Sequence, residues 1–278
     1  MAPIEVPDDW LMALAADLSD PTANAANPIV GVALLGSFAR GEATRYSDVD
    51  VVRFAKREPE RESDRYTLRL VDERIVSVTT TTVAAKRAEL AQPESAVWAV
   101  AGLRQARILL DSDSALAALI DEARAFQWAP LQAAADAYAS DLLTGLAEEA
   151  GKIMGGLARG DESAIVYGAL GLLPGLVRAV IVQRGVLLRS ENACFVQPQD
   201  AVGRDSTWAH ALRLAAGIEA PPTAAARTSP PPTAAPAQAH ALAMLRLYRE
   251  TAVLLDPIIR PADRAVIAHT LRLLEAFV

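Results

Sequence analysis

Strand-type patterns occur only in the first part of the chain. Short apolar runs with β-branched residues, which favour strands, occur at 29–35, 47–54, 66–71, 74–80 and 107–111. Asp72 and Glu73 separate the third run from the fourth and predict a hairpin turn. After Trp128 the strand patterns stop and only helical periodicity continues. This distribution predicts an α/β (α+β) domain with a small mixed sheet over 1–128, followed by an all-α helical domain over 129–278.

Helical patterns alternate with the strands and then follow one another. In the first domain we expect helices at 7–18, 83–90, 94–104 and 114–126. In the second domain the patterns predict helices at 131–157, 161–188, 200–217, 240–255 and 261–277. Gly160 is expected to stop the first of these, and Asp161 is expected to cap the start of the next. The segment 220–236 is rich in Pro, Ala and Thr and is interpreted as a mobile linker or extended loop.

Composition excludes several classes of protein. The net charge is −7, and the sequence has no cluster of Lys and Arg, which argues against a nucleic-acid partner. Cys194 is the only cysteine, so no internal disulfide is possible and a reducing compartment is expected. The most apolar stretch, 168–188, contains Pro174 and Arg178, which predicts a buried core helix and no membrane span. We therefore expect a cytoplasmic protein with no membrane partner.

A glycine turn after the first strand has the chemistry of a phosphate site. Gly36 permits a tight turn and a close approach of phosphate to the backbone. Ser37 adds a hydroxyl donor, and the backbone N–H groups that follow it open a short helix, which is a favourable position for an anion. Within the same segment Arg40 and Ser47 are further candidate nucleotide-binding residues.

Asp48 and Asp50 add the chemistry of a metal site. They are two residues apart on a predicted strand, so both side chains project from one face. A divalent cation relieves the repulsion between two carboxylates, and Mg²⁺ prefers one or two carboxylates together with phosphate oxygens. Taken separately, the glycine turn and the Asp-x-Asp pair are more simply interpreted as a loop and a solvated strand, because Asp-x-Asp pairs are common. The combination after a buried strand favours a cradle for a metal-bound triphosphate.

The segment GSFARGEATRYSDVDVV resembles the catalytic loop of the DNA polymerase beta nucleotidyltransferase superfamily, in particular its aminoglycoside-modifying (kanamycin) branch. The Tyr46-Ser47-Asp48 lead-in is similar as well. Further on, Glu148 to Lys152 resembles the Glu-x-Ala-Gly-Lys segment of that branch. The resemblance implies Mg²⁺, a nucleoside triphosphate such as ATP, and a homodimer. It also implies that Glu148 is the general base and that Lys152 lies near the phosphates.

Spacing alone gives Glu148 a different role. Glu148 and Lys152 are four residues apart on a predicted helix, where such pairs are usually solvated ion pairs. Glu149 is the competing candidate, but it lies about 100° around the helix from Glu148. On the resemblance we expect Glu148 to face a cleft with Asp48 and Asp50, in one subunit or across a dimer.

One position departs from the superfamily. A third carboxylate is expected on a later strand, and the counterpart here is the strand at 74–80. Val76 and Val78 are expected to face the core, which places Ser77 where that acid would be. Asp72 and Glu73 are nearby in the predicted turn, so the third acid is either missing or displaced.

Two functions follow from these patterns. The first is an enzyme that moves a nucleoside monophosphate from a Mg²⁺-bound triphosphate to a hydroxyl of a small molecule, such as an aminoglycoside-like antibiotic. The alternative is a nucleotide-binding regulatory or antitoxin-like protein with a degenerate site, which Ser77 favours. A nucleic-acid polymerase is disfavoured by the acidity and the scarcity of aromatic residues.

Overall fold

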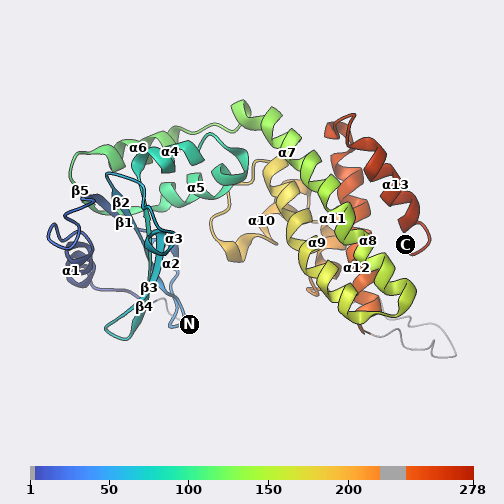
Figure 1. Ribbon diagram of the computed structural model, residues 1–278, viewed down its shortest axis with the longest axis horizontal. Helices are drawn as coiled ribbons and strands as arrows, with labels where there is room; N and C mark the ends of the chain where they lie inside the picture. Colours follow the sequence, from blue (N-terminus) through green and yellow to red (C-terminus); the bar gives the residue numbers. More distant parts are fainter. Residues whose placement is uncertain (1–3, 220–235) are drawn as a thin grey trace. The chain divides into compact units, whose positions relative to one another are not determined.

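The computed structural model describes residues 4–219 and 236–278. The chain divides into two compact units, Met1–Ala129 and Pro130–Val278 (Figure 1). The linker predicted at 220–236 lies outside the described residues, except that Pro236 begins a helix.

The first unit is built on a five-stranded mixed sheet. Its strands are β1 (Ile29–Leu34), β2 (Val49–Ala55), β3 (Tyr66–Val71), β4 (Arg74–Thr81) and β5 (Arg107–Asp111). Their order across the sheet is β3-β4-β2-β1-β5. β2 and β4 are parallel, and the other neighbours are antiparallel. The predicted small mixed sheet is confirmed.

Helices cover the two faces of this sheet. They are α1 (Asp8–Leu18), α2 (Gly36–Ala39), α3 (Glu62–Arg65), α4 (Val83–Glu89), α5 (Pro93–Gln105) and α6 (Ala115–Ala125). On one face Val49 and Val51 pack with the apolar side of α1. On the other face Val52 and Phe54 pack with α5 and α6 (Figure 1). Alternation along β2 therefore supplies two apolar cores, one on each side of the sheet.

The β3–β4 hairpin turns at the predicted residues. Asp72 has a φ of 47° and Glu73 a φ of 63°, both in the left-handed region. Two such residues in succession are typical of the type I′ turn, whose twist matches that of the flanking strands. The hairpin therefore fixes the register in which Leu68 opposes Ser77.

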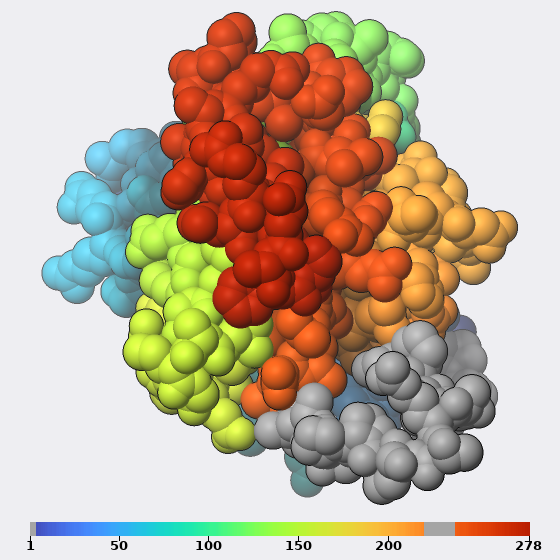
Figure 2. Space-filling view, turned by 90° about the vertical axis from the view of Figure 1, so that its right-hand side faces the viewer, coloured from blue at the N-terminus to red at the C-terminus, as the bar shows by residue number. Residues whose placement is uncertain are grey.

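The second unit is helical throughout its described part. It contains α7 (Gln132–Gly145), α8 (Ala147–Arg159), α9 (Glu162–Gln183), α10 (Gln197–Val202), α11 (Thr207–Ala215), α12 (Pro236–Leu255) and α13 (Arg264–Leu274), with short 3-10 turns at Ala129–Leu131, Glu191–Ala193 and Asp256–Ile258. α9 packs against α7, α8 and α12. Figure 2 shows α12 and α13 on the surface of this unit, and both contact α8. The predicted all-α architecture is confirmed.

The single helix predicted over 131–157 is wrong, because the chain forms α7 and α8 with a break at Leu146. Gly145, a weak helix former, ends α7. A Cβ on Gly175 of α9 would come within 2.6 Å of the Leu146 side chain, so the missing side chain of this glycine leaves room for Leu146. The break therefore depends on packing between helices. Gly160 ends α8 with a φ of 67°, as predicted.

Two further helix boundaries differ from the prediction. α9 begins after Asp161, whose side chain accepts the N–H of Ala164 as expected. It ends at Gln183 and not at 188, because Gly185 turns the chain with a φ of 61°. The helix predicted at 200–217 is divided into α10 and α11 by Gly203, with a φ of 102°.

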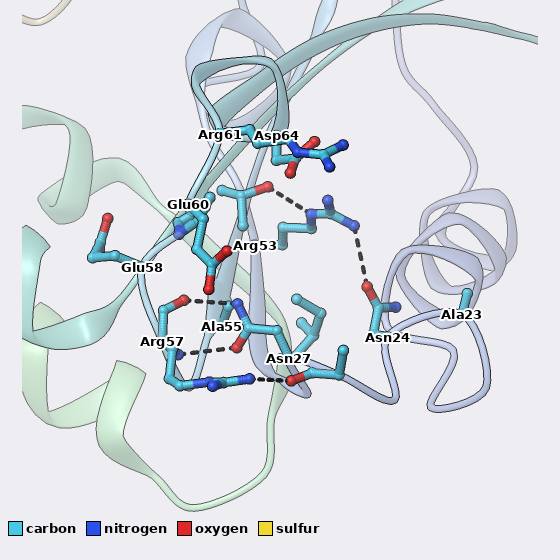
Figure 3. Close-up of a pocket in the computed structure, with 14 residues that line it drawn as sticks. Ala23, Asn24, Asn27, Arg53, Ala55, Arg57, Glu58, Glu60, Arg61 and Asp64 are labelled. Atoms are coloured by element: carbon cyan, nitrogen blue, oxygen red, sulfur yellow. Dashed lines mark hydrogen bonds between the residues drawn. The ribbon is translucent and has the colours of Figure 1, made fainter.

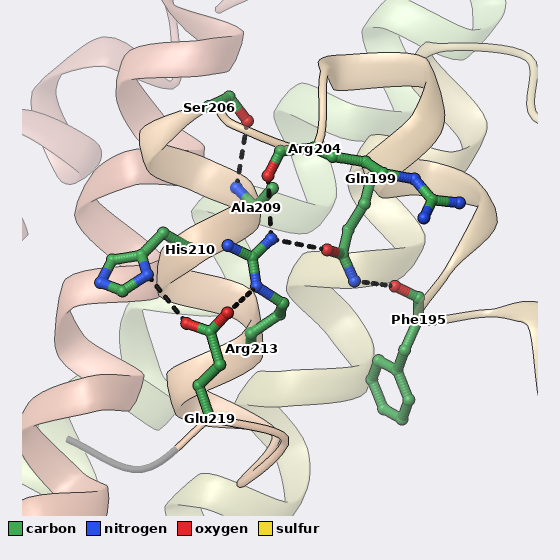
Figure 4. A network of polar contacts seen from close by, with 8 residues as sticks. All are labelled: Phe195, Gln199, Arg204, Ser206, Ala209, His210, Arg213 and Glu219. Atoms are coloured by element: carbon green, nitrogen blue, oxygen red, sulfur yellow. Dashed lines mark hydrogen bonds and ion pairs between the residues drawn. The ribbon is translucent and has the colours of Figure 1, made fainter.

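Arg213 joins α10 and α11 across this division. Its Nη1 donates to the side-chain oxygen of Gln199 and to the carbonyl of Arg204, at 2.9 Å each (Figure 4). Its Nε donates to Glu219, which also contacts Nδ1 of His210 at 3.0 Å. These contacts join α10 and α11 to the segment that follows α11.

α9 is the one helix in the described part of the chain that is long and apolar enough to cross a membrane. It is mostly buried in the helical unit, where Leu172 and Leu176 are 0% exposed. The helix is therefore the core helix of a globular unit, as its sequence predicted.

Candidate active site

Gly36 lies directly against the carboxylate of Asp50. The N–H of Leu35 donates to the carbonyl of Asp50 at 2.8 Å, which joins the end of β1 to the start of β2. Gly36 has a φ of 65°, in the left-handed region. A Cβ at this position would lie 1.8 Å from Oδ2 of Asp50, so no other residue fits here without a shift. The glycine turn and Asp50, the second acid of the Asp-x-Asp pair, are thus packed directly against each other.

Ser77 is the neighbour of Asp50 on the parallel strand β4. Its Oγ donates to Oδ1 of Asp50 at 2.8 Å, and the side chain is only 5% exposed. Val76 and Val78 face the core on the other side. The prediction that Ser77 faces Asp50 is confirmed, and so is the register of the strand.

The acids of the hairpin turn do not replace the third carboxylate. Oδ2 of Asp72 accepts a hydrogen bond from the indole N–H of Trp10 at 2.8 Å. Glu73 precedes Ser77 by four residues, which is roughly 13 Å along a strand. In residues 4–219 and 236–278 no group of three or more His, Cys, Asp or Glu side chains is placed to hold a metal. Neither Asp72 nor Glu73 therefore takes the place of the third acid.

The remaining donors fit one magnesium ion shared with phosphate. β2 begins at Val49, so Asp48 immediately precedes the strand and Asp50 is its second residue. Both are partly buried. The carboxylate of Asp50 lies against the glycine turn, and Asp48 is two residues before it. Such a pair suits Mg²⁺, which takes one or two carboxylates and completes its shell with phosphate oxygens.

The hydroxyl residues of the loop have different local roles. The carbonyl of Ser37 accepts the N–H of Glu42 at 2.9 Å, which closes the loop after α2. Its hydroxyl has no protein hydrogen bond in the described part of the chain, which leaves that donor available to a ligand. The Oγ of Ser47 accepts the N–H of Thr44 at 2.9 Å and shapes the turn before Asp48.

Arg40 is held by two residues that sequence analysis did not single out. Its Nε lies 2.9 Å from Oε2 of Glu42, and Nη1 donates to Gln105 at 3.4 Å. Glu42 is close in sequence, but Gln105 ends α5 and carries no local signal of this contact. The side chain of Arg40 is 15% exposed, so the loop, α5 and the guanidinium are fixed together.

Glu148 and Lys152 lie on α8 in the helical unit. Nζ of Lys152 is 3.1 Å from Oε1 of Glu148 and 2.8 Å from Oε1 of Glu149. Hydrogen bonds with Glu149 and then Glu148 raise the pKa of Lys152. Although Glu148 and Glu149 are offset around the helix, both carboxylates therefore contact Lys152. Their exposure differs, at 76% for the Glu148 side chain and 21% for that of Glu149.

The glycine turn and the two aspartates, which the sequence predicted as a phosphate and metal site, lie at the end of β1 and the start of β2 in this mixed sheet. The family of the nucleotidyltransferase domain matches residues 22–98, a span that includes Gly36, Asp48, Asp50 and Ser77. Residues 22–98 of the chain therefore form a nucleotidyltransferase domain. Nucleotide transfer in general is the activity that this domain supports.

Solved structures similar to this chain include one that is similar over most of its length. It is a nucleotidyltransferase-like protein from Exiguobacterium sibiricum, with 13% sequence identity and a TM-score of 0.47. The similarity covers 92% of this chain and 77% of that protein. No curated protein matches the sequence.

Replacing Ser77 with aspartate is expected to tighten the binding of Mg²⁺ with a triphosphate, on the order of tenfold, because it adds a third carboxylate beside Asp50. The Ser77→Asn variant has the same shape without the charge and is the matched control. Titration calorimetry with Mg²⁺ and a non-hydrolysable ATP analogue measures the effect. Equal affinities for the two variants would mean that Ser77 does not lie within reach of the metal.

Proposed function

We propose that the protein transfers a nucleoside monophosphate from a Mg²⁺-bound triphosphate, with ATP the first choice, to a hydroxyl of a small molecule. An aminoglycoside-like antibiotic is the proposed class of acceptor, which would make the protein a resistance enzyme. The observation that carries the proposal is the contact between Gly36 and Asp50 inside the nucleotidyltransferase domain. The net charge of −7 suits a cationic acceptor.

The residues of the first unit bind and orient the triphosphate in this mechanism. Asp48 and Asp50 would hold Mg²⁺, and the backbone at Gly36 with the hydroxyl of Ser37 would contact the phosphates. Ser77 fixes the orientation of the Asp50 carboxylate through its hydrogen bond. Arg40 and Ser47 hold the loop in place. Bound Mg²⁺ would neutralise charge on the phosphate oxygens as the bond to pyrophosphate breaks.

Glu148 is the proposed general base. The acceptor oxygen forms a bond to the α-phosphorus, the bond between the α-phosphorus and the bridging oxygen breaks, and pyrophosphate leaves with that electron pair. The acceptor proton passes to the carboxylate of Glu148. The high exposure of Glu148 supports access by an acceptor, whereas Glu149 is mostly covered. Lys152 is then the cation that attracts the phosphates.

The hydrogen bond between Ser77 and Asp50 favours a second candidate. With a serine in place of the third acid, the site supports nucleotide binding more directly than fast turnover. A nucleotide-binding regulatory or antitoxin-like protein would need only that binding. A homodimer, a cytoplasmic location and the absence of a nucleic-acid partner belong to the first proposal and rest on the sequence.

Release of pyrophosphate separates the two candidates. Purified protein is incubated with Mg²⁺, each of the four ribonucleoside triphosphates and a panel of aminoglycosides, and pyrophosphate is measured with a coupled assay. An enzyme is expected to release pyrophosphate only when both an acceptor and Mg²⁺ are present. Triphosphate binding without release, for every acceptor, would favour the regulatory candidate.

A further inference from the structure

A cavity lies in the first unit, away from the Gly36–Asp50 contact. It has a volume of about 490 Å³, within the usual range for small-molecule sites (Figure 3). Its walls are the loop between α1 and β1, the end of β2, the loop after β2, and α3. Arg53 is three residues beyond Asp50 on β2, so its side chain leaves the opposite face of the sheet, roughly 10 Å along the strand.

Arg53 is a cation in the wall of this cavity, and within the described part of the chain its hydrogen-bond partners are neutral groups. Its Nε donates to Oγ1 of Thr80 at 2.7 Å, and Nη1 donates to Oδ1 of Asn24 at 3.5 Å (Figure 3). Burial lowers the pKa of Arg53, the nearby Arg69 lowers it further, and Asp64 opposes both. A partly desolvated guanidinium with neutral partners gains most from an anionic ligand, with which it forms strong, charge-assisted hydrogen bonds.

Two more arginines, Arg57 and Arg61, line the same cavity. Within residues 4–219 and 236–278, no ion pair joins a carboxylate to Arg53, Arg57 or Arg61. Arg57 donates to the carbonyl of Ala26, and within that part of the chain Arg61 has no side-chain hydrogen bond or ion pair. Most of the N–H donors of three cations therefore remain available to a ligand.

The wall of the cavity is formed before any ligand binds. The side chain of Asn27 accepts the backbone N–H of Arg57 at 3.0 Å and donates to its carbonyl at 2.8 Å. This two-way contact ties the loop before β1 to the loop after β2 (Figure 3). A preformed wall lowers the entropy cost of binding, which is what a ligand site requires.

Three carboxylates share the cavity with the arginines. Glu58 accepts the N–H of Thr82 at 2.8 Å and is committed to the start of α4. Glu60 and Asp64 remain, so the lining has one cation more than its uncommitted acids. A simple polyanion is poorly matched to such a wall. The better match is a small molecule with one compact oxyanion for the arginines and hydrogen-bond donors elsewhere for the two acids.

We propose that this cavity is a second ligand site, in which Arg53 and Arg61 bind the carboxylate or phosphate head of a small organic anion while Glu60 and Asp64 accept hydrogen bonds from the rest of the molecule. The site is distinct from the candidate active site, because it opens on the other face of the sheet. Arg53 and Thr80 bridge β2 and β4, the same two strands that carry Asp50 and Ser77. A ligand in this cavity would therefore contact β2 and β4 on the sheet face opposite to Asp50 and Ser77.

Titration with two simple anions tests the proposal. Inorganic phosphate and lactate, which has one carboxylate and a hydroxyl donor, are titrated separately into the protein without divalent metal, and binding is followed by calorimetry or by amide chemical shifts. At least one of them is expected to bind, and which one binds identifies the head group. Arg53→Gln and Arg61→Gln are each expected to weaken that binding on the order of tenfold or more. Raising the salt concentration is expected to weaken it as well.

Matched variants locate the binding. Arg65→Gln removes the same charge from α3, outside the cavity, and is expected to leave the affinity unchanged. Asp48→Asn is also expected to leave it unchanged, so the result does not depend on the proposed transfer reaction. Arg61→Gln removes no hydrogen bond or ion pair of the described residues, so it serves as a control for a folding defect in Arg53→Gln. Binding of neither anion, or equal binding by wild type and both cavity variants, would refute the second site.

Discussion

Replacing Glu148 with glutamine is expected to leave triphosphate binding intact and to lower turnover by about a hundredfold or more. Glutamine keeps the shape of the side chain and can still accept a hydrogen bond, but it cannot take the proton of the acceptor hydroxyl. Steady-state kinetics with an acceptor identified by pyrophosphate release measures turnover. Calorimetry with a non-hydrolysable triphosphate measures binding separately.

Glu149→Gln is the matched control for this experiment. Glu149 is the next residue on α8, and its carboxylate contacts the same lysine at 2.8 Å. A Cβ on Gly171 of α9 would lie 3.1 Å from its carboxyl carbon, so Glu149 is packed against the neighbouring helix. Its replacement is expected to affect stability more than turnover. A large loss of turnover for Glu149→Gln with normal turnover for Glu148→Gln would assign the base to Glu149.

The strands and the hairpin could be predicted because their signals are local. β-branched apolar runs marked β1, β2 and β5, and the adjacent Asp72 and Glu73 marked the hairpin turn. The break at Leu146 could not be predicted from periodicity, because the apolar spacing continues across it. The decisive contact is with Gly175, on a helix that packs against α8.

Part of the candidate site could also be predicted from local sequence signals. The glycine turn and the Asp-x-Asp pair are 12 to 14 residues apart, and the alternation of Val76 and Val78 was enough to orient Ser77. The contact of Arg40 with Gln105 joins residues 65 positions apart and has no periodic signal. The cavity around Arg53 is similar, since its walls come from loops whose side chains show no pattern in the sequence.

The central claim is that Asp48 and Asp50 hold the metal of a bound triphosphate, and Asp48→Asn tests it most directly. This variant removes one carboxylate of the Asp-x-Asp pair and preserves the shape of the side chain. The control is Asp72→Asn, which loses the same charge in the β3–β4 turn while its amide oxygen can still accept from Trp10.

The measurement is calorimetric titration with a non-hydrolysable ATP analogue, with and without Mg²⁺, for the wild type and both variants. The wild type and Asp72→Asn are expected to bind the analogue more tightly with Mg²⁺ than without it. Asp48→Asn is expected to lose that gain, with an affinity in Mg²⁺ lower by about tenfold or more. Mg²⁺-dependent binding by Asp48→Asn equal to that of the wild type would contradict the account.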